Sequence, residues 1–320
     1  MSTPTQEHHV AGYLQGKNIA ITGAAGGIGR AVALACAAEG ANIVVADFGV
    51  SMAGQDPTSE VADKVVAEIK NLGVDAIAVA DDVSKMEAGE RIVSAAVDSW
   101  GSIDGVVCVA GILRERMLFN MTESDWDDVF AVHAKGHFTL FRAASAVMRQ
   151  QRSGTLIGFT SGAFQGSVAQ ANYSAAKGAI VSLVRSAALG MRKYGVTANA
   201  IAPVARTRMS DNVPMDIEMG EPGDVAPLVV HLLSDSARHI SGQVFTSVGG
   251  RVAVWSQPRE VRSVTKDGRW DPRELGATLD ATVGQERMPM FDMMDEWAAK
   301  AAAKKATADA SDTSGADAAS

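Results

Sequence analysis

The stretch IAITGAAGGIGRAV, residues 19–32, decides the fold of this chain. An apolar run with strand character ends at Thr22, and a segment with helical periodicity follows the turn. The turn itself contains Gly23, Gly26, Gly27 and Gly29. Glycines at these positions permit a tight turn and a close approach of backbone N–H groups to a pyrophosphate at the positive end of a helix. The spacing predicts a dinucleotide site, although a helix start packed with small residues has the same pattern.

The rest of the chain continues this alternation of strand and helix. Seven short runs rich in Val and Ile are predicted strands, at 17–23, 42–48, 75–83, 105–111, 155–161, 196–203 and 242–250. Predicted helices lie between them, at 28–39, 59–72, 85–100, 125–149 and 173–194. Strands that are apolar nearly throughout are covered on both faces. We therefore expect an α/β fold, a single doubly wound Rossmann domain with a seven-stranded parallel sheet and helices on both faces, which binds ligands at the carboxyl ends of its strands.

The sequence divides into four segments of different character. Residues 1–16 are polar and are expected to be disordered, and residues 17–254 form the Rossmann catalytic domain. Residues 255–297 contain three tryptophans but are too short for an independent domain, so we interpret them as a C-terminal extension packed on the body or on a partner subunit. Residues 298–320 form an Ala-rich tail that is expected to be disordered, because it has too little apolar surface to offset the ordering entropy. An exposed Ala-rich helix in its first half is the alternative.

Composition excludes several classes of protein. The formal net charge is −8 and the pI is near 5.3, so the electrostatic footprint of a nucleic-acid-binding protein is absent. No run reaches the roughly 18 apolar residues of a membrane span, and the N-terminal residues lack the pattern of a signal peptide. Cys36 and Cys108 lie among apolar residues and are expected to be free buried thiols, with no disulfide and no metal site. We expect a cytoplasmic protein without a membrane or nucleic-acid partner.

A carboxylate at the end of the second predicted strand points to the cofactor. Asp47 lies 18 positions beyond Gly29, close to the spacing at which an acidic residue accepts hydrogen bonds from the adenosine ribose. A carboxylate there repels a 2′-phosphate, so NAD is favoured over NADP, with a merely solvated strand end as the alternative. Asp82 and Val83 close the third strand and are candidates to hold the adenine, whereas Asp81 or Asp82 are equally candidates to cap the next helix.

Tyr173 and Lys177 carry the strongest chemical signal. They are four residues apart in YSAAK and share one face of a predicted helix. An ammonium beside a phenol stabilises the phenolate and lowers a pKa that is ordinarily about 10. Such a phenol can exchange a proton with a substrate alcohol or carbonyl while hydride passes to or from nicotinamide, and Lys177 can donate to the nicotinamide ribose. Alone, a Tyr–Lys pair is more often an ordinary surface pair.

Together these motifs resemble the short-chain dehydrogenase/reductase family over residues 17–250. The matching stretches are TGAAGGIG at 22–29, DDV at 81–83, AG at 110–111 and YSAAK at 173–177, with Asp47 and Ser161 as single residues. The resemblance implies that Ser161 hydrogen-bonds the reacting oxygen and positions it for Tyr173. It assigns the cofactor contacts to Thr22, Gly23, Gly27, Ile28, Gly29, Asp47, Asp82, Val83, Ala110, Gly111, Tyr173, Lys177 and Thr207.

The chain departs from the family pattern beside these catalytic residues. The family serine lies one position further from the tyrosine: Ser161 is 12 residues before Tyr173, and Thr160 is 13 before. We favour Ser161, with Thr160 as the alternative hydroxyl. The family Asn-Asn-Ala-Gly is Cys-Val-Ala-Gly here, and its catalytic Asn is His133. A neutral imidazole also donates and accepts, so His133 is a fourth catalytic candidate with a pH dependence near 6.5, or else a structural helix histidine.

Residues 111–138 resemble a narrower branch, the dehydrogenase modules of peroxisomal multifunctional enzymes and the related 17β-hydroxysteroid and sterol side-chain dehydrogenases. That resemblance implies NAD-dependent interconversion of a secondary alcohol and a ketone on a bulky apolar small molecule, a 3-hydroxyacyl-CoA or a steroid-like compound. The expected substrate lid, 203–222, contains several methionines, and its Arg206 and Arg208 are candidates to meet phosphates of CoA or of the cofactor. Solvated side chains are the alternative for both arginines.

Two other functions stay open at this stage. The presence of Val109 and His133 where the family has Asn is compatible with a non-catalytic NAD-binding scaffold. An NADP-dependent carbonyl reductase is the third hypothesis. The predicted helices 125–149 and 173–194 resemble those that form the family's dimer interface. We therefore expect a homodimer or a homotetramer.

Overall fold

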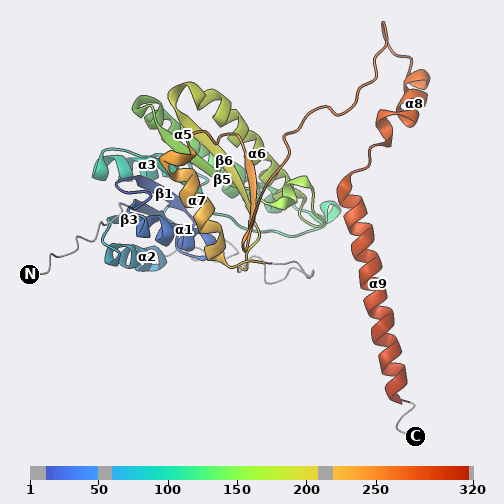
Figure 1. Ribbon diagram of the computed structural model, residues 1–320, viewed down its shortest axis with the longest axis horizontal. Coiled ribbons are helices and arrows are strands. Elements are labelled where there is room, and N and C mark those ends of the chain that lie inside the picture. Colours follow the sequence, from blue (N-terminus) through green and yellow to red (C-terminus); the bar gives the residue numbers. More distant parts are fainter. Residues whose placement is uncertain (1–11, 50–59, 208–218, 317–320) are drawn as a thin grey trace, which may run out of the picture. The chain divides into compact units, whose positions relative to one another are not determined.

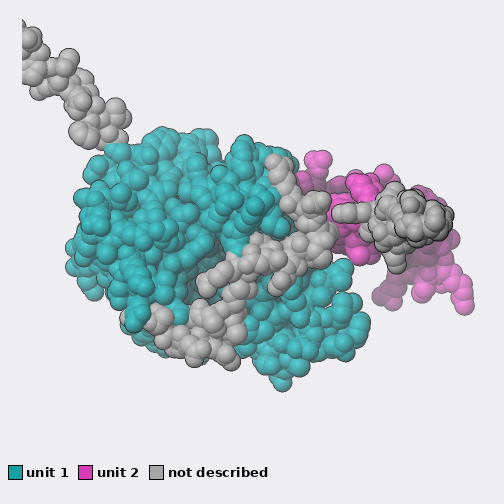
Figure 2. Space-filling model, turned by 90° about the horizontal axis from the view of Figure 1, so that it is seen from below, with its two compact units in different colours: residues 1–255 teal, residues 256–320 magenta. Residues whose placement is uncertain are grey.

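The computed structural model describes residues 12–49, 60–207 and 219–316 (Figure 1). The chain divides into two compact units, Met1–Trp255 and Ser256–Ser320 (Figure 2). This division lies one residue beyond the boundary that we expected at 254. Among the described helices, none is both long enough and apolar enough to cross a membrane.

The first unit is built on one sheet with the strand order β3-β2-β1-β4-β5-β6-β7-β8. β1 to β7 are parallel, which confirms the predicted doubly wound arrangement. The predicted strand number is corrected, because a turn at Gly249-Gly250 allows an eighth strand to pair antiparallel with β7. The strands are β1 (Asn18–Thr22), β2 (Asn42–Ala46), β3 (Ala76–Val79), β4 (Gly105–Cys108), β5 (Gly154–Phe159), β6 (Val196–Pro203), β7 (Val244–Val248) and β8 (Arg251–Val254).

Four of the five predicted helices begin and end within a few residues of their predicted bounds, whereas α7, α8 and α9 were not predicted. The segment predicted as a single helix over 125–149 consists of α4, a π-helical turn at Ala131–Lys135, and α5. This segment begins two residues earlier than predicted, at Glu123, because Thr122 and Asp125 form a reciprocal capping box. The helices are α1 (Gly27–Ala38), α2 (Glu60–Asn71), α3 (Met86–Trp100), α4 (Glu123–Phe130), α5 (Gly136–Gln151), α6 (Ala171–Met191), α7 (Ala226–Leu233), α8 (Pro272–Ala281) and α9 (Pro289–Ala316).

Helices cover both faces of the sheet (Figure 1). Successive strand residues point to opposite faces, so each strand supplies two apolar clusters. Ile157 of β5 belongs to the cluster that α1, α2 and α7 cover, while its neighbour Leu156 belongs to the cluster that α3, α5 and α6 cover. Both side chains are fully buried. The central strands are therefore apolar on both faces, as the sequence indicated.

The parallel register brings the carboxyl ends of β1, β4 and β5 together on one side of the sheet, which we call the carboxyl edge. Thr22, the last residue of β1, pairs with Cys108 of β4, which pairs with Gly158 of β5. The glycine turn after β1, the Ala110-Gly111 pair after β4 and Ser161 after β5 consequently emerge side by side. The candidate site residues that are distant in the sequence meet at this edge.

The second unit contains α8 and α9. α9 continues to Ala316, so the alternative of an Ala-rich helix applies to the segment 298–320, and the helix extends beyond the first half of that segment. Alanine has the highest intrinsic helix propensity, and a helix satisfies its own backbone hydrogen bonds without burying apolar surface. Low apolar content therefore argued against a packed core in this segment, but not against a helix.

We predict that Ile157→Ala lowers the free energy of unfolding by about 2–5 kcal/mol, because it leaves a cavity in the central strand of the sheet. Urea unfolding followed by circular dichroism measures the change. Val254→Ala, in the edge strand β8 where Val254 is 60% exposed, is the control and should change the free energy by no more than about 0.5 kcal/mol. Equal losses in the two variants would contradict the assignment of the core.

Candidate active site

The turn after β1 is shaped by the absence of side chains. Gly23 has a positive φ of 66°, and a Cβ atom there would lie 2.8 Å from the backbone nitrogen of Ala110. A Cβ atom on Gly29 would lie 2.0 Å from the carbonyl oxygen of Gly23. Thr22 closes the base of the turn, since its hydroxyl accepts from the backbone N–H groups of Val109 and Ala110. The turn is a cradle of backbone with Ile28 in the first turn of α1, and it fits a dinucleotide pyrophosphate.

Two of the expected nucleotide contacts lie beside this turn. Asp47 follows β2, and its carboxylate accepts from the N–H groups of Ala25 and Gly49 at 2.9 and 2.8 Å. Thr207 lies over the turn, with its methyl carbon 3.7 Å from the position that a Cβ atom on Gly27 would take. The two ends of a bound dinucleotide would therefore have candidate partners on both sides of the glycines. Arg206 is also described and is exposed, whereas Arg208 lies outside the described residues.

The Asp81–Val83 segment does not cap the next helix. β3 ends at Val79, and the N-cap residue of α3 is Lys85. The Asp82 carboxylate accepts from the Ser84 N–H, and Asp81 forms a two-fold ion pair with Arg91. The capping alternative is therefore wrong for both aspartates, because each carboxylate is bound elsewhere.

Ser161 and Thr160 end β5 with their hydroxyls in different environments. The Ser161 hydroxyl accepts from the Ala163 N–H and lies close enough to the Tyr173 phenol to lower its pKa. The Thr160 hydroxyl is buried and donates to the carbonyl of Lys177 at 2.9 Å. Of the two hydroxyls weighed from the sequence, that of Ser161 is the one beside the phenol.

Lys177 does not bind Tyr173 directly. Its ammonium is buried, donates to the Phe159 carbonyl at 2.7 Å, and lies 5.3 Å from the centre of the Tyr173 ring. Burial lowers the pKa of Lys177 to about 7. Burial also raises the pKa of Tyr173 to about 12, against a lowering contribution from its hydrogen bond with Ser161. The expected lowering of the phenol pKa by the cation is therefore wrong for the protein alone, because desolvation outweighs it.

His133 lies in the π-helical turn and is almost fully buried. Its Nε2 is 2.8 Å from the Ile112 carbonyl, and its ring meets the Tyr173 ring edge-on at 5.2 Å. Gly111 has no room for a side chain, because a Cβ atom there would lie 2.4 Å from the imidazole. Burial and the charge of Lys177 hold the pKa of His133 well below its ordinary value, so the expected titration near pH 6.5 is wrong. Its Nδ1 is buried and has no hydrogen-bond partner among the described residues.

Sequence reasoning missed two residues that hold this arrangement together. Asn172 is fully buried, and its amide donates to the carbonyls of Arg114 and Asp125, which fixes the start of α6 against the segment after β4. His137 is buried in α5 and bonds to both His133 and Phe159. The spacing of His133 and His137, four apart on one helix, was the available signal for the second residue.

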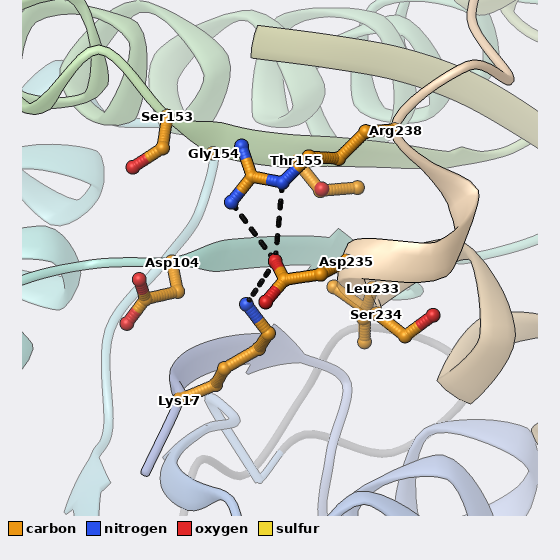
Figure 3. Close-up of a pocket in the computed structure, with 9 residues that line it drawn as sticks. All are labelled: Lys17, Asp104, Ser153, Gly154, Thr155, Leu233, Ser234, Asp235 and Arg238. Atoms are coloured by element: carbon orange, nitrogen blue, oxygen red, sulfur yellow. Dashed lines mark hydrogen bonds and ion pairs between the residues drawn. The ribbon is translucent and has the colours of Figure 1, made fainter. Parts of the chain in front are cut away.

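A polar pocket lies at the opposite edge of the sheet and contains none of the predicted site residues. Lys17 precedes β1, Asp104 precedes β4, and the pocket is thus at the amino ends of the strands. Lys17 and Arg238 both point toward Asp235, and each donates to its carboxylate at 2.9 Å (Figure 3). The charges in this pocket neutralise one another. Among the described residues, no group of His, Cys, Asp or Glu is arranged to hold a metal ion.

Comparisons with known proteins show one family and one fold. A family model described as short chain dehydrogenase matches residues 17–217. The hydroxyacyl-CoA dehydrogenase ChsB1 of Mycobacterium tuberculosis is 41% identical over 301 residues, which are 88% of this chain and 93% of that protein. Peroxisomal multifunctional enzyme type 2 of Mus musculus is 43% identical over 71% of this chain but only 31% of its own length. The crystal structure of a short chain dehydrogenase from Mycobacterium avium shares 41% identity with a TM-score of 0.77, and the match covers 86% of this chain and 97% of that one.

We predict that the free energy of unfolding falls between pH 7 and pH 5. Burial lowers the pKa of His137 from 6.5 to about 3, so the unfolded chain takes up a proton below pH 6.5 while the folded chain does not. The stabilisation is thus present above pH 6.5 and is lost as the pH falls, by about 2 kcal/mol at pH 5. Urea unfolding at the two pH values measures the fall in the free energy of unfolding, both in the unsubstituted protein and in His137→Gln. The fall should be smaller by about 2 kcal/mol in His137→Gln.

The exposed histidine His239 provides the control. His239→Gln should keep the loss seen in the unsubstituted protein. If His137→Gln loses as much stability as the unsubstituted protein between pH 7 and pH 5, the buried neutral state of His137 is wrong.

Proposed function

The chain belongs to the short chain dehydrogenase family, as its motifs predicted, and from this premise we propose that it oxidises a secondary alcohol on a 3-hydroxyacyl-CoA or a steroid-like substrate with NAD. The observation that carries the proposal is that Ser161 lies beside the Tyr173 phenol at the carboxyl ends of the strands, where the glycine turn also lies. A proton acceptor, an orienting hydroxyl and a nucleotide cradle are needed together for this chemistry.

In this proposal Ser161 and Tyr173 bind the substrate oxygen between their hydroxyls. In the oxidation, the phenol proton of Tyr173 first passes toward the Lys177 amine, and the resulting phenolate takes the hydroxyl proton of the substrate. In the reduction, Tyr173 gives its proton to the substrate oxygen and regains one from the side of Lys177. When bound, the nicotinamide supplies the hydride acceptor. Lys177 lies beneath the phenol ring with a pKa near neutrality, so it can release or take up a proton around pH 7. His133 contributes its unpaired Nδ1 to hold a water on the proton path.

The residues around the glycine turn support NAD. The backbone of the turn is suited to the pyrophosphate, and Thr207 is our candidate contact for the nicotinamide end. Asp47 would accept from the adenosine ribose hydroxyls, and Asp82, Val83, Ala110 and Gly111 would line the nucleotide. A carboxylate at Asp47 repels a second phosphate on that ribose, which disfavours NADP.

An apolar substrate is supported by side chains near the site. Leu118 and Phe119, which follow β4, are 69% and 78% exposed, and Val168 shortly before α6 is 59% exposed. The two segments are joined, because the Arg116 N–H donates to the Ala169 carbonyl at 2.7 Å. Exposed large apolar side chains in one place are typical of binding surfaces. The homo-oligomeric state and the cytoplasmic location stay predictions from the sequence.

We predict that Tyr173→Phe lowers kcat by roughly 10²-fold or more, because it removes the proton acceptor and keeps the ring. The assay is a panel of 3-hydroxyacyl-CoA compounds and hydroxysteroids with NAD, followed by NADH absorbance. Cofactor affinity, measured by quenching of tryptophan fluorescence, should be unchanged within about twofold. Turnover of the panel by the variant at the unsubstituted rate would overturn the role of Tyr173.

Ser161→Ala and Thr160→Val separate the two hydroxyls. Ser161→Ala should lower kcat strongly, whereas Thr160→Val should chiefly lower the free energy of unfolding, by about 1 kcal/mol, through its lost bond to Lys177. The opposite pattern would assign the orienting role to Thr160. If the unsubstituted protein binds NAD but turns over no member of the panel, the result supports the hypothesis of a non-catalytic NAD-binding scaffold.

We predict that Asp47→Ala lowers the preference for NAD over NADP by about 10-fold or more, because it removes the repulsion of the 2′-phosphate and the acceptor for the ribose. Dissociation constants for both cofactors measure the change. Asp82→Ala is the comparison variant, since its carboxylate binds Ser84 and is not expected to discriminate the two cofactors. A preference for NADP in the unsubstituted protein would contradict the proposal directly.

A further inference from the structure

We propose that His137 is a positioning residue for the active site. Its side chain holds the end of β5 in place, so that the Phe159 carbonyl can bind the Lys177 ammonium. This inference rests on the proposed function, because it concerns the same proton path. His137 does not touch the phenol or the substrate oxygen in this arrangement. It acts through the backbone of Phe159 and through the carbonyl of His133.

The hydrogen bonds of His137 fix its protonation and its orientation. Its Nδ1 lies 2.7 Å from the His133 carbonyl, and since a carbonyl only accepts, Nδ1 carries the hydrogen. Its Nε2 is then an acceptor, and it receives the Phe159 N–H at 3.1 Å. Burial holds the pKa of His137 at about 3, so the ring stays neutral and keeps this acceptor at physiological pH. Both ring nitrogens are thus used, each in the role that its partner requires.

Phe159 passes this constraint to Lys177. The residue lies at the end of β5, and its N–H is bound by His137 while its C=O is bound by the Lys177 ammonium at 2.7 Å. Thr160 adds a second tie, because its hydroxyl donates to the Lys177 carbonyl. A continuous chain of hydrogen bonds therefore runs from the π-helical turn through His137 and Phe159 to the ammonium.

The space around His137 is matched to the imidazole. A Cβ atom on Gly158 would lie 3.2 Å from the Cδ2 atom of His137 and 3.0 Å from a methyl of Ile180, so the glycine leaves room for the ring. The ring also meets Phe141 edge-on at 6.2 Å. The imidazole is consequently held in one place by packing as well as by hydrogen bonds. A buried polar group with both partners satisfied is suited to fixing geometry.

Three substitutions at His137 separate its two bonds. Gln reaches as far as Nε2 and offers an acceptor to the Phe159 N–H, whereas Asn reaches only the His133 carbonyl, and Leu offers neither bond. If the bond to Phe159 positions Lys177, His137→Leu and His137→Asn should lower kcat at least 10-fold with KM for substrate and NAD within twofold. His137→Gln should recover most of kcat. Because Gln also fills more of this buried space than Asn, the free energy of unfolding of each variant is measured beside kcat.

The control is Thr197→Val, which removes a buried hydroxyl bond to Thr155 at the amino ends of β5 and β6. This variant should lose stability and keep kcat. Circular dichroism establishes that each variant is folded, and the contrast of Gln with Asn still decides the matter if His137→Leu does not fold. Equal kcat values in the Gln and Asn variants, or a fall in all variants that follows stability alone, would overturn the inference.

A second measurement does not need turnover. Acylation of Lys177 by an amine-reactive reagent, followed by peptide mass spectrometry, reports how tightly the ammonium is held. His137→Asn and His137→Leu should accelerate this acylation at least fivefold, and His137→Gln should not. If no substrate of the panel is oxidised but the acylation rates follow this order, the proposed function fails while the positioning role holds. If turnover is found and the acylation rates are equal, the positioning role fails alone.

Discussion

The close contact between the glycine turn and the end of β4 is the constraint on which the site depends. Gly23 lies against Ala110, and Gly29 lies against Gly23, at distances that no side chain could occupy. Because of this contact, the first helix begins directly at the sheet edge and leaves its backbone N–H groups facing outward. The register of the parallel strands then fixes where the residues after β4 and β5 emerge relative to the turn. The proposed nucleotide cradle and the proposed proton-transfer site therefore become neighbours through backbone contacts, in a protein whose net charge is negative.

Burial, more than pairing, sets the acid–base properties of the site. Lys177 has a carbonyl as its acceptor, and no carboxylate pairs with it in the part of the chain that the structure describes, so desolvation lowers its pKa to about 7. The same burial keeps the Tyr173 phenol neutral and the two histidines of the π-helical region uncharged. The charge balance of the site is therefore sensitive to any group that enters it. A cluster of neutral, hydrogen-bonded groups around one buried amine can pass a proton from group to group, as the proposed path through Tyr173 and Lys177 requires.

The π-helical turn connects the chemistry to the scaffold. A π-helical turn often marks a functional position inside an α-helix, and here it carries His133 between α4 and α5. Its bond to Ile112 holds the segment after β4, and Gly111 lacks a side chain because the imidazole takes that space. His137, one helical turn later, ties the same region to β5. The substitution of a histidine for the family asparagine is thus accompanied by surrounding residues that fit it.

From the sequence alone we could predict the glycine turn, the apolar strands, the Tyr173–Lys177 pair and the acidic residue Asp47. These features follow from periodicity and spacing, because those signals are local. The resemblance to the short chain dehydrogenase family was confirmed over residues 17–217. The three-dimensional structure was needed to show which hydroxyl lies beside the phenol and which pKa values burial shifts. It was also needed to show that an eighth strand pairs with β7 at the edge of the sheet. It also brought Asn172, His137 and Phe159 into the site. These depend on contacts between elements far apart in the chain, and the desolvation of a side chain is a property of everything packed around it.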